Sequence, residues 1–397
     1  MIQNIIKISD KSLEYLFLAT LFLFPVSLAL SNTLLGLLLI FYIINKMLNK
    51  DFSIPKTIIN KYILAFFIFS FLSFINTNDL QMSLDTLLSP NFKYAAFFII
   101  SYDLLNMKKT DSYINLLTYG ALFLLIGGLY IDYFGNDSFF YRANAYGATA
   151  SFLMIFFLAL LIYNNQKKYN ILYVLGFLLS INAIVFSYSR GATLGLITAV
   201  VFVLGIYLWK MLRGRFKKRQ LFLITIIFLS FVLIITPFIL PERLISRFKN
   251  TNLNYNTNPR LLMWRTTIEM IKSHPIIGTG LGTFNHYFLY YVDNVFEGAS
   301  LSTSNRGHEK PHNLYLFIAA EQGIPSLFIY LSGLFLVFKK SFKKYLESNK
   351  KNVLILSWSL LGFMVQVFIH SFVDTSVLYS QVGLYVIIFL ALFLKQN

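Results

Sequence analysis

The chain has 397 residues, of which 57% are hydrophobic and 13% are charged, and it contains no cysteine. A soluble domain carries about 25% charged residues, so this composition excludes an ordinary soluble protein, and the lack of cysteine excludes disulfides and thiolate metal sites. The formal net charge of +17 would indicate nucleic-acid binding in a soluble protein, but in a membrane protein the placement of the charges decides their meaning.

The apolar residues occur in runs of about 16 to 22, which is the length of helix that crosses a bilayer. Because backbone groups must be hydrogen-bonded inside the bilayer, each run predicts a helix. The first run continues straight into a second one, so we expect an uncleaved anchor rather than a signal peptide. The predicted spans lie at 14–30, 33–48, 61–76, 92–107, 112–131, 148–163, 169–187, 191–210, 220–240, 313–338, 353–372 and 377–395.

Basic residues gather in alternate loops between these spans. Those loops and the two ends of the chain hold 23 of the 34 lysines and arginines, which the positive-inside rule assigns to the cytoplasm. We therefore predict an all-α polytopic membrane protein of about twelve transmembrane helices, with both termini cytoplasmic and no nucleic-acid partner. The basic loops lie at 46–61, 108–109, 167–168, 210–219 and 339–351.

One loop on the opposite side is long, and a loop of that length usually has a function or a structure of its own. It divides the chain into a nine-span bundle at 1–240, a loop with helical segments at 241–312, and three further spans at 313–397. The first of those three is interrupted near 323–325, where Gly-Ile-Pro favours a kink.

Two arginines on this outer side run against the charge bias. Arg190 lies at the junction of two spans, where it can either bind lipid phosphate by snorkelling or serve a function. Arg260 follows Asn258 and Pro259, which suit the cap and first turn of a helix, and Trp264 lies one turn further on. A cation in a first turn opposes the helix dipole, which favours a bound anion there, although stacking of Arg260 on Trp264 also explains the spacing.

His312 lies where the long loop meets the next span. A helix N-terminus keeps a nearby histidine neutral and able to accept a proton, whereas an isolated histidine there often only bonds to backbone. Glu321, in the interrupted span, and Asp374, in the last outer turn, can each orient a base, bind a hydroxyl or pair with a basic group.

Other motifs lack the context that their chemistry needs. His308 and His312 match the spacing of a zinc protease, but Pro311 would break the helix that must carry both ligands. The glycines of 278–282 follow no strand and precede no Lys-Ser/Thr pair, so they favour a tight turn over a nucleotide loop. No Asp-x-Asp pair occurs, which argues against a metal-dependent sugar-nucleotide transferase.

Three stretches together resemble the O-antigen ligase and polymerase family of bacterial inner membranes. The resemblance covers residues 140–340 well, through the order and spacing of the stretches rather than any one of them. They are Ser189-Arg190-Gly191-Ala192, then Arg260 and Trp264 followed by His274-Pro275-Ile276-Ile277-Gly278-Thr279-Gly280, then His312-Asn313 with Leu316 and Glu321-Gln322-Gly323.

The resemblance implies a GT-C-like, metal-independent glycosyltransferase without a cofactor, with its active site facing the periplasm. Such enzymes transfer glycan from undecaprenyl diphosphate, and ligases use lipid A-core as the acceptor. By the resemblance, Arg190 and Arg260 match the family's essential arginines, and His312 matches its essential histidine. Trp264 and Glu321 are further substrate-binding candidates, and Arg142 is a weaker one.

The sequence leaves two alternatives to a ligase. A polymerase of the same family would join repeat units, although such polymerases often have two long outer loops and this chain has one. A transporter with twelve spans would place charged groups near the middle of the bilayer and often shows paired repeats. Here the spans contain few charges and the candidates lie at the outer ends of spans, which favours the ligase.

Overall fold

The computed structural model describes residues 2–25, 27–134, 143–164, 166–213, 245–246, 259–295, 310–375 and 381–396. Within these residues every regular element is helical and no strand is formed. The α-helices are α1 (Ile2–Leu23), α2 (Leu28–Asn49), α3 (Asn60–Leu72), α4 (Leu80–Thr86), α5 (Lys93–Leu104), α6 (Thr110–Phe134), α7 (Ala143–Tyr163), α8 (Asn170–Ser187), α9 (Arg190–Leu212), α12 (Pro259–Ser273), α13 (Phe284–Val295), α14 (Leu314–Glu347), α15 (Lys351–His370) and α16 (Gln381–Lys395).

The all-helical membrane fold is confirmed, but the count of twelve spans is not. Eleven predicted spans coincide with helices, and the twelfth, at 220–240, lies outside the described residues. Seven described helices are long and apolar enough to cross a membrane, namely α2, α6, α7, α8, α9, α14 and α15. Two shorter apolar helical stretches, Asn60–Asn76 and Val382–Lys395, have fewer than the roughly 20 residues that a straight crossing needs. Helix α5 has 12 residues but continues directly from α4 through the π-helix Leu87–Phe92.

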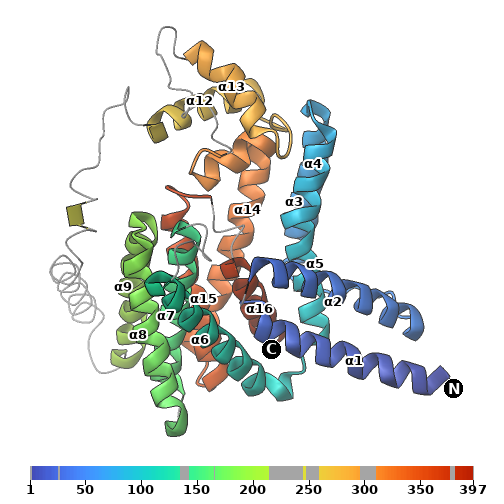
Figure 1. The fold of residues 1–397 in the computed structure, drawn as a ribbon, viewed down its shortest axis with the longest axis vertical. Coiled ribbons are helices and arrows are strands. Elements are labelled where there is room, and N and C mark those ends of the chain that lie inside the picture. Colours follow the sequence, from blue (N-terminus) through green and yellow to red (C-terminus); the bar gives the residue numbers. More distant parts are fainter. Residues whose placement is uncertain are drawn as a thin grey trace.

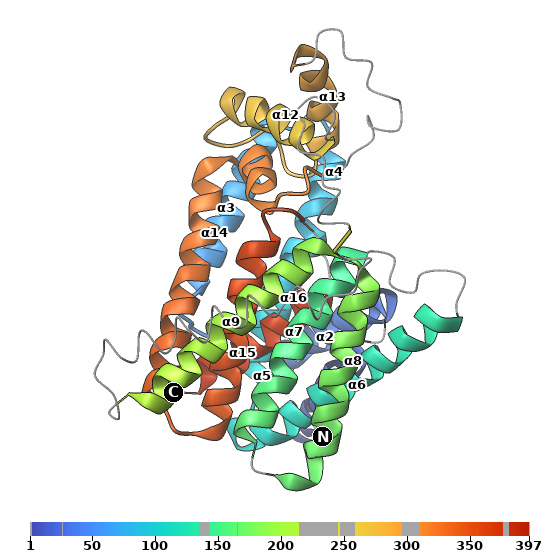
Figure 2. The same cartoon turned by 90° about the vertical axis from the view of Figure 1, so that its left-hand side faces the viewer.

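The first two helices differ from the prediction in bounds and direction. The predicted span at 14–30 overlaps α1 only as far as Leu23, because α1 ends there and the chain turns before α2. Proline at position 25 cannot continue a helix, and Ser27 then caps α2 by accepting a 3.0 Å hydrogen bond from the Leu30 N–H. In Figures 1 and 2, α1 and α2 run across the long axis that α3 and α14 follow.

Aromatic side chains form the centre of the bundle between α7, α15 and α16. Phe152 makes edge contacts with Phe363 and Phe389 at ring-centroid distances of 5.4 and 5.1 Å. On the other side of α15, Trp358 is fully buried and donates a 3.0 Å hydrogen bond to the Val203 carbonyl of α9. Helix α9 packs closely here because Gly195 brings its backbone against the Gln366 carbonyl.

Helices α12 and α13 cover one end of this bundle, above the start of α14 (Figures 1 and 2). Both belong to the segment that the sequence predicted as a long outer loop with helical parts. A separate apolar cluster joins them to α14, since Met270 of α12 and Phe284 of α13 are buried with Phe317. The two helices are thus packed onto the bundle by side chains of their own.

Candidate functional site

Arg190 is positioned by the sharp turn between α8 and α9. Tyr188 ends α8 in the left-handed conformation, with φ of 47°, and Ser189 caps α9 by accepting a hydrogen bond from the Ala192 N–H at 3.3 Å. Arg190 is the first residue of α9 and is partly buried. Both the turn and the cap therefore fix where its side chain leaves the backbone.

Gly191 brings this turn against the end of α15. A Cβ added at Gly191 would lie 2.5 Å from Cγ2 of Val373 and 2.7 Å from Cδ2 of His370. Real Cβ atoms do not approach that closely, so only glycine allows the contact. As a result, Arg190 begins directly beside the last residue of α15.

The turn at 370–375, at the end of α15, contains four buried polar residues, whereas Phe372 is exposed. His370, Ser371, Asp374 and Thr375 all have side chains hidden from solvent. The Ser371 carbonyl accepts a 2.9 Å hydrogen bond from the Leu314 N–H, which joins this turn to the first residue of α14. Buried polar groups need partners, so such a turn is a place where side chains from several helices are held together.

His312 lies beside this turn. Its Nδ1 is 3.9 Å from Oδ2 of Asp374, and its side chain is 38% exposed whereas that of Asp374 is 4% exposed. His312 adopts a left-handed conformation with φ of 48°, which is uncommon outside glycine. Asn313 then caps α14 through hydrogen bonds from the N–H groups of Tyr315 and Leu316 at 3.0 and 3.1 Å. The imidazole therefore sits at a helix N-terminus, with one buried carboxylate behind it.

Helix α12 adds Arg260 and Trp264 to the same place. The Trp264 Nε1–H donates a 3.0 Å hydrogen bond to the Pro311 carbonyl, and this fixes the peptide that precedes His312. Arg260 lies one turn earlier on α12, within electrostatic reach of the His370 imidazole. The guanidinium of Arg260 and the carboxylate of Asp374 thus both act on His370.

The structure therefore brings Arg190, Arg260 and His312 around the 370–375 turn, although they are far apart in the sequence. Arg142, in contrast, lies outside the described residues, as does His308 of the zinc-protease pattern. Within the described part of the chain, no group of three His, Cys, Asp or Glu side chains is arranged to hold a metal ion. Among the described residues, the two arginines contribute guanidinium groups to this site.

Glu321 lies away from this turn and contacts the backbone of the glycine-rich loop. Its side chain is buried, and Oε1 accepts a 3.1 Å hydrogen bond from the N–H of Phe284, the first residue of α13. A carboxylate at this position stabilises the N-terminus of a helix. Its role in substrate binding stays a prediction, and its contacts favour a structural role instead.

The glycine-rich loop at 275–283 repairs a break in α14. Gly323 has a φ of 85°, and Pro325 has no N–H to donate to the carbonyl of Glu321. The Gly280 N–H takes that place at 3.1 Å, and the Ile324 N–H bonds the Pro275 carbonyl at 2.9 Å. The kink predicted at 323–325 is confirmed, and the loop glycines shape a turn that supplies the missing backbone partners.

The sequence analysis gave no role to His370, which the structure puts at the centre of the site. This imidazole is fully buried, and its Nε2 has no hydrogen-bond partner among the described residues. A histidine in the last turn of an otherwise apolar span was a usable signal, because ionisable groups in such spans are rare and functional by default.

These observations define a class of protein, namely a multi-pass helical membrane protein with two arginines and a histidine gathered at one end of its bundle. Comparison with known families gives the same result in more detail, because residues 175–331 match the family model described as O-antigen ligase. Over these residues the chain is similar to the O-antigen ligase family, which confirms the resemblance found in the sequence. No protein among the curated proteins matches the chain.

The matched stretch contains Arg190, Arg260 and His312, and it ends before the 370–375 turn. The family supports a glycosyltransferase of the ligase and polymerase kind, in agreement with the apolar helices of a membrane protein.

Proposed function

We propose that this protein transfers O-antigen glycan from undecaprenyl diphosphate to a lipid A-core sugar, at the periplasmic face of a bacterial inner membrane. The observation that carries the proposal is the convergence of Arg190, Arg260 and His312 on the 370–375 turn, within or beside a domain of the O-antigen ligase family.

The two arginines bind the diphosphate of the donor. A pyrophosphate leaving group concentrates negative charge, and a planar guanidinium can bind phosphate oxygens through two parallel hydrogen bonds. Arg190 stands at the start of α9 and Arg260 at the start of α12, so the positive ends of two helix dipoles add to their charge. Charge that develops on the leaving diphosphate is thereby stabilised.

His312 accepts the proton of the acceptor hydroxyl as that oxygen attacks the anomeric carbon. The buried carboxylate of Asp374, 3.9 Å from Nδ1, stabilises the imidazolium that forms. One new glycosidic bond forms while the bond to the diphosphate oxygen breaks, and the diphosphate leaves with the electron pair. An attack from the face opposite the leaving group inverts the anomeric configuration.

An apolar groove supports a donor that is carried on a lipid. It has a volume of about 280 Å³ and is lined by side chains of α3, α5, α14, α15 and α16, among them Phe66, Tyr330 and Val367. Val367 lies one turn before His370 on α15, so the groove begins next to the candidate site. A polyprenyl chain in this groove would have its diphosphate near the arginines.

Purified protein, incubated with undecaprenyl-diphosphate glycan and lipid A-core, tests the proposal. We expect glycan to appear on the core at the same rate with and without a chelator, because arginines replace a divalent metal. Loss of transfer in chelator would contradict this mechanism. In cells, deletion should leave polymerised glycan on the lipid carrier, whereas core capped with a single unit would identify a polymerase.

A further inference from the structure

A polar cavity lies at the start of α15, at the opposite end of this helix from His370. It has a volume of about 560 Å³ and is formed where the ends of α14 and α16 meet the starts of α6 and α15. Helix α15 has 20 residues and is therefore about 30 Å long, so this cavity is far from His370. The lining contains one carboxylate among the described residues, that of Glu347. It also contains four lysines, which are Lys344, Lys350, Lys351 and Lys395.

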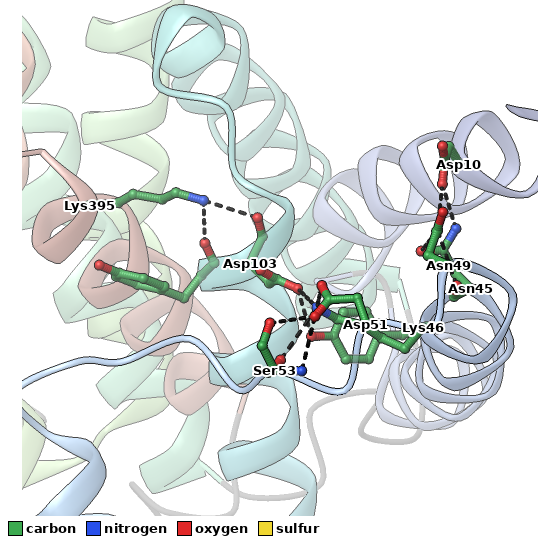
Figure 3. A network of polar contacts seen from close by, with 10 residues as sticks. Asp10, Asn45, Lys46, Asn49, Asp51, Ser53, Asp103 and Lys395 are labelled. Carbon is green, nitrogen blue, oxygen red and sulfur yellow. Dashed lines mark hydrogen bonds and ion pairs between the residues drawn. The ribbon is translucent and has the colours of Figure 1, made fainter. Parts of the chain in front are cut away.

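The neighbouring polar network shows how lysines at this end are usually balanced (Figure 3). There, Lys46 forms ion pairs with Asp51 at 2.8 Å and with Asp103 at 2.9 Å. Hydrogen bonds from Lys46 and Ser53 hold the pKa of Asp51 well below its usual range. Lys46 thus has two carboxylates, those of Asp51 and Asp103. Among the described residues, the four cavity lysines have Glu347 in the lining, Asp111 beside Lys351, and Asp103, which already pairs with Lys46.

Among the described residues, Lys351 is the one cavity lysine that forms an ion pair, and the Asp103 carboxylate acts on Lys395 without pairing with it. Lys351 pairs with Asp111 at 3.2 Å. Lys395 donates to the carbonyls of Tyr102 and Asp103 at 2.6 and 3.0 Å, as Figure 3 shows. Lys344 likewise donates to a carbonyl, that of Gln396. Carbonyl groups are neutral, so the like charges around the cavity still repel one another unless an anion lies between them.

The start of α15 adds further donors to the same cavity. Lys350 occupies the cap position but makes no side-chain cap, and Lys351, Asn352 and Val353 of the first turn line the cavity. The first N–H groups of a helix have no acceptor within it, and they carry the positive end of its dipole. Beside four ammonium groups, these N–H groups complete a binding site for a phosphate.

Asn352 indicates a ligand with more than a phosphate. Its Oδ1 is buried and has no hydrogen-bond partner among the described residues. This oxygen is an acceptor, so a hydroxyl near the phosphate would satisfy it. A glycerol headgroup carries such hydroxyls. The cavity also lies at the ends of the membrane-spanning helices α6, α14 and α15, which is the depth of lipid headgroups.

We propose that the cavity between Lys344, Lys350, Lys351 and Lys395 binds the phosphate of an anionic glycerophospholipid, with the phosphatidylglycerol headgroup as the chemistry that fits best. This site is separate from the glycosyltransferase site and does not rest on the proposed function. The bound lipid would join the end of α14 to the starts of α6 and α15 and to the end of α16.

The test compares Lys350→Glu with Lys343→Glu in the full-length protein. Both lysines are exposed and both changes alter the net charge equally, but only Lys350 lines the cavity. The proteins are purified in micelles of a neutral detergent and titrated with phosphatidylglycerol or, separately, with phosphatidylcholine. Native mass spectrometry counts bound lipid, and a thermal scan gives the melting temperature. The scan without phosphatidylglycerol reports whether each variant folds.

We expect phosphatidylglycerol to bind to the wild type and raise its melting temperature. Lys350→Glu should weaken this binding about tenfold, because each basic group near a lipid phosphate contributes about a factor of five and the change also adds a repelling charge. Lys343→Glu should bind as the wild type does. Equal affinity in both variants, or equal stabilisation by phosphatidylcholine alone, overturns the site.

Inorganic phosphate and glycerol phosphate at millimolar concentration form the soluble arm of the experiment. If the lipid is the ligand, neither should raise the melting temperature as phosphatidylglycerol does. Equal protection by inorganic phosphate would overturn the assignment to a lipid in favour of a soluble phosphate.

Discussion

The two ends of α15 carry charge in opposite ways. At the His370 end, the charged groups are few and come from four different parts of the chain, and a buried turn holds them together. At the Lys351 end, lysines are numerous and most of their partners are backbone carbonyls or other flexible side chains.

The two ends thus have different roles: the lysines orient the protein in the membrane, and the groups at the His370 end serve the proposed reaction. Lysines at the Lys351 end act by their number, as the positive-inside rule describes, and exchange of one for another changes little. At the His370 end each group has one position, so a small displacement should be costly. The following predictions test whether function is indeed confined to the His370 end, and how exact its geometry must be.

The largest effect is expected from removing the charged and basic groups themselves. Arg190→Ala, Arg260→Ala and His312→Ala should each lower glycan transfer by about a thousandfold or more, because charge stabilisation and proton transfer are lost. Initial rates of transfer by purified protein give the measurement. Arg265→Ala is the matched control, since Arg265 is exposed on the same helix as Arg260. A variant that inserts and keeps full activity would remove its residue from the mechanism.

Gly191→Ala should reduce transfer by about a hundredfold while the protein still inserts. The added methyl group would collide with Val373 and His370 and push the start of α9 away from the 370–375 turn, and displacements of about 1 Å can have an effect of this size. Gly36→Ala provides the control, because nothing lies within 4 Å of that position. An active Gly191→Ala protein would show that the geometry of this end is tolerant, and the contrast between the two ends would weaken.

Trp264→Phe should have a smaller effect, about fivefold on transfer. The ring is kept, but the hydrogen bond from Nε1 to the Pro311 carbonyl is lost, and one such bond contributes about 1 kcal/mol. Trp209→Phe, near the other end of α9, should leave the rate unchanged. A fall in both variants would point to stability rather than to the position of His312, and melting temperatures would distinguish these causes.

The smallest effect is expected from the apolar groove. Gly333 lines it, and a Cβ added there would lie 3.6 Å from Cβ of Tyr62, its nearest neighbour. Gly333→Leu would therefore fill part of the space without a backbone clash. We expect about a threefold rise in KM for the lipid-linked donor with kcat unchanged, since only uniform binding is lost. Gly36→Leu serves as the control. An unchanged KM would argue that the donor lipid lies elsewhere.

Much of the candidate site could be predicted from the sequence. Arg190 and Arg260 were visible as exceptions to a charge rule, and His312 was visible as a histidine before a helix. The kink at Gly323 was also predictable, because glycine and proline act locally. These signals share one property, which is that each depends on residues near one another in the chain.

What the sequence could not supply depends on distant contacts. Glu321 was a candidate for substrate binding, and the sequence could not show that it accepts a hydrogen bond from the N–H of Phe284, 37 residues earlier. His370 was passed over because its neighbour Gly191 lies far away in the sequence. Similarly, hydropathy identified an apolar run at 92–107 but could not show that helical structure there begins as early as Leu80 and includes a π-helix at Leu87–Phe92.

The break at Gly323 also has a consequence for protein engineering. Residues 314–322 are hydrogen-bonded to the glycine-rich loop and to the 370–375 turn, whereas the rest of α14 packs within the bundle. Helix α14 thus consists of two parts that are joined at Gly323. A chimera that exchanges only residues 324–347 for the matching part of another protein should keep the site intact, because the glycine-rich loop and the 370–375 turn both stay in place.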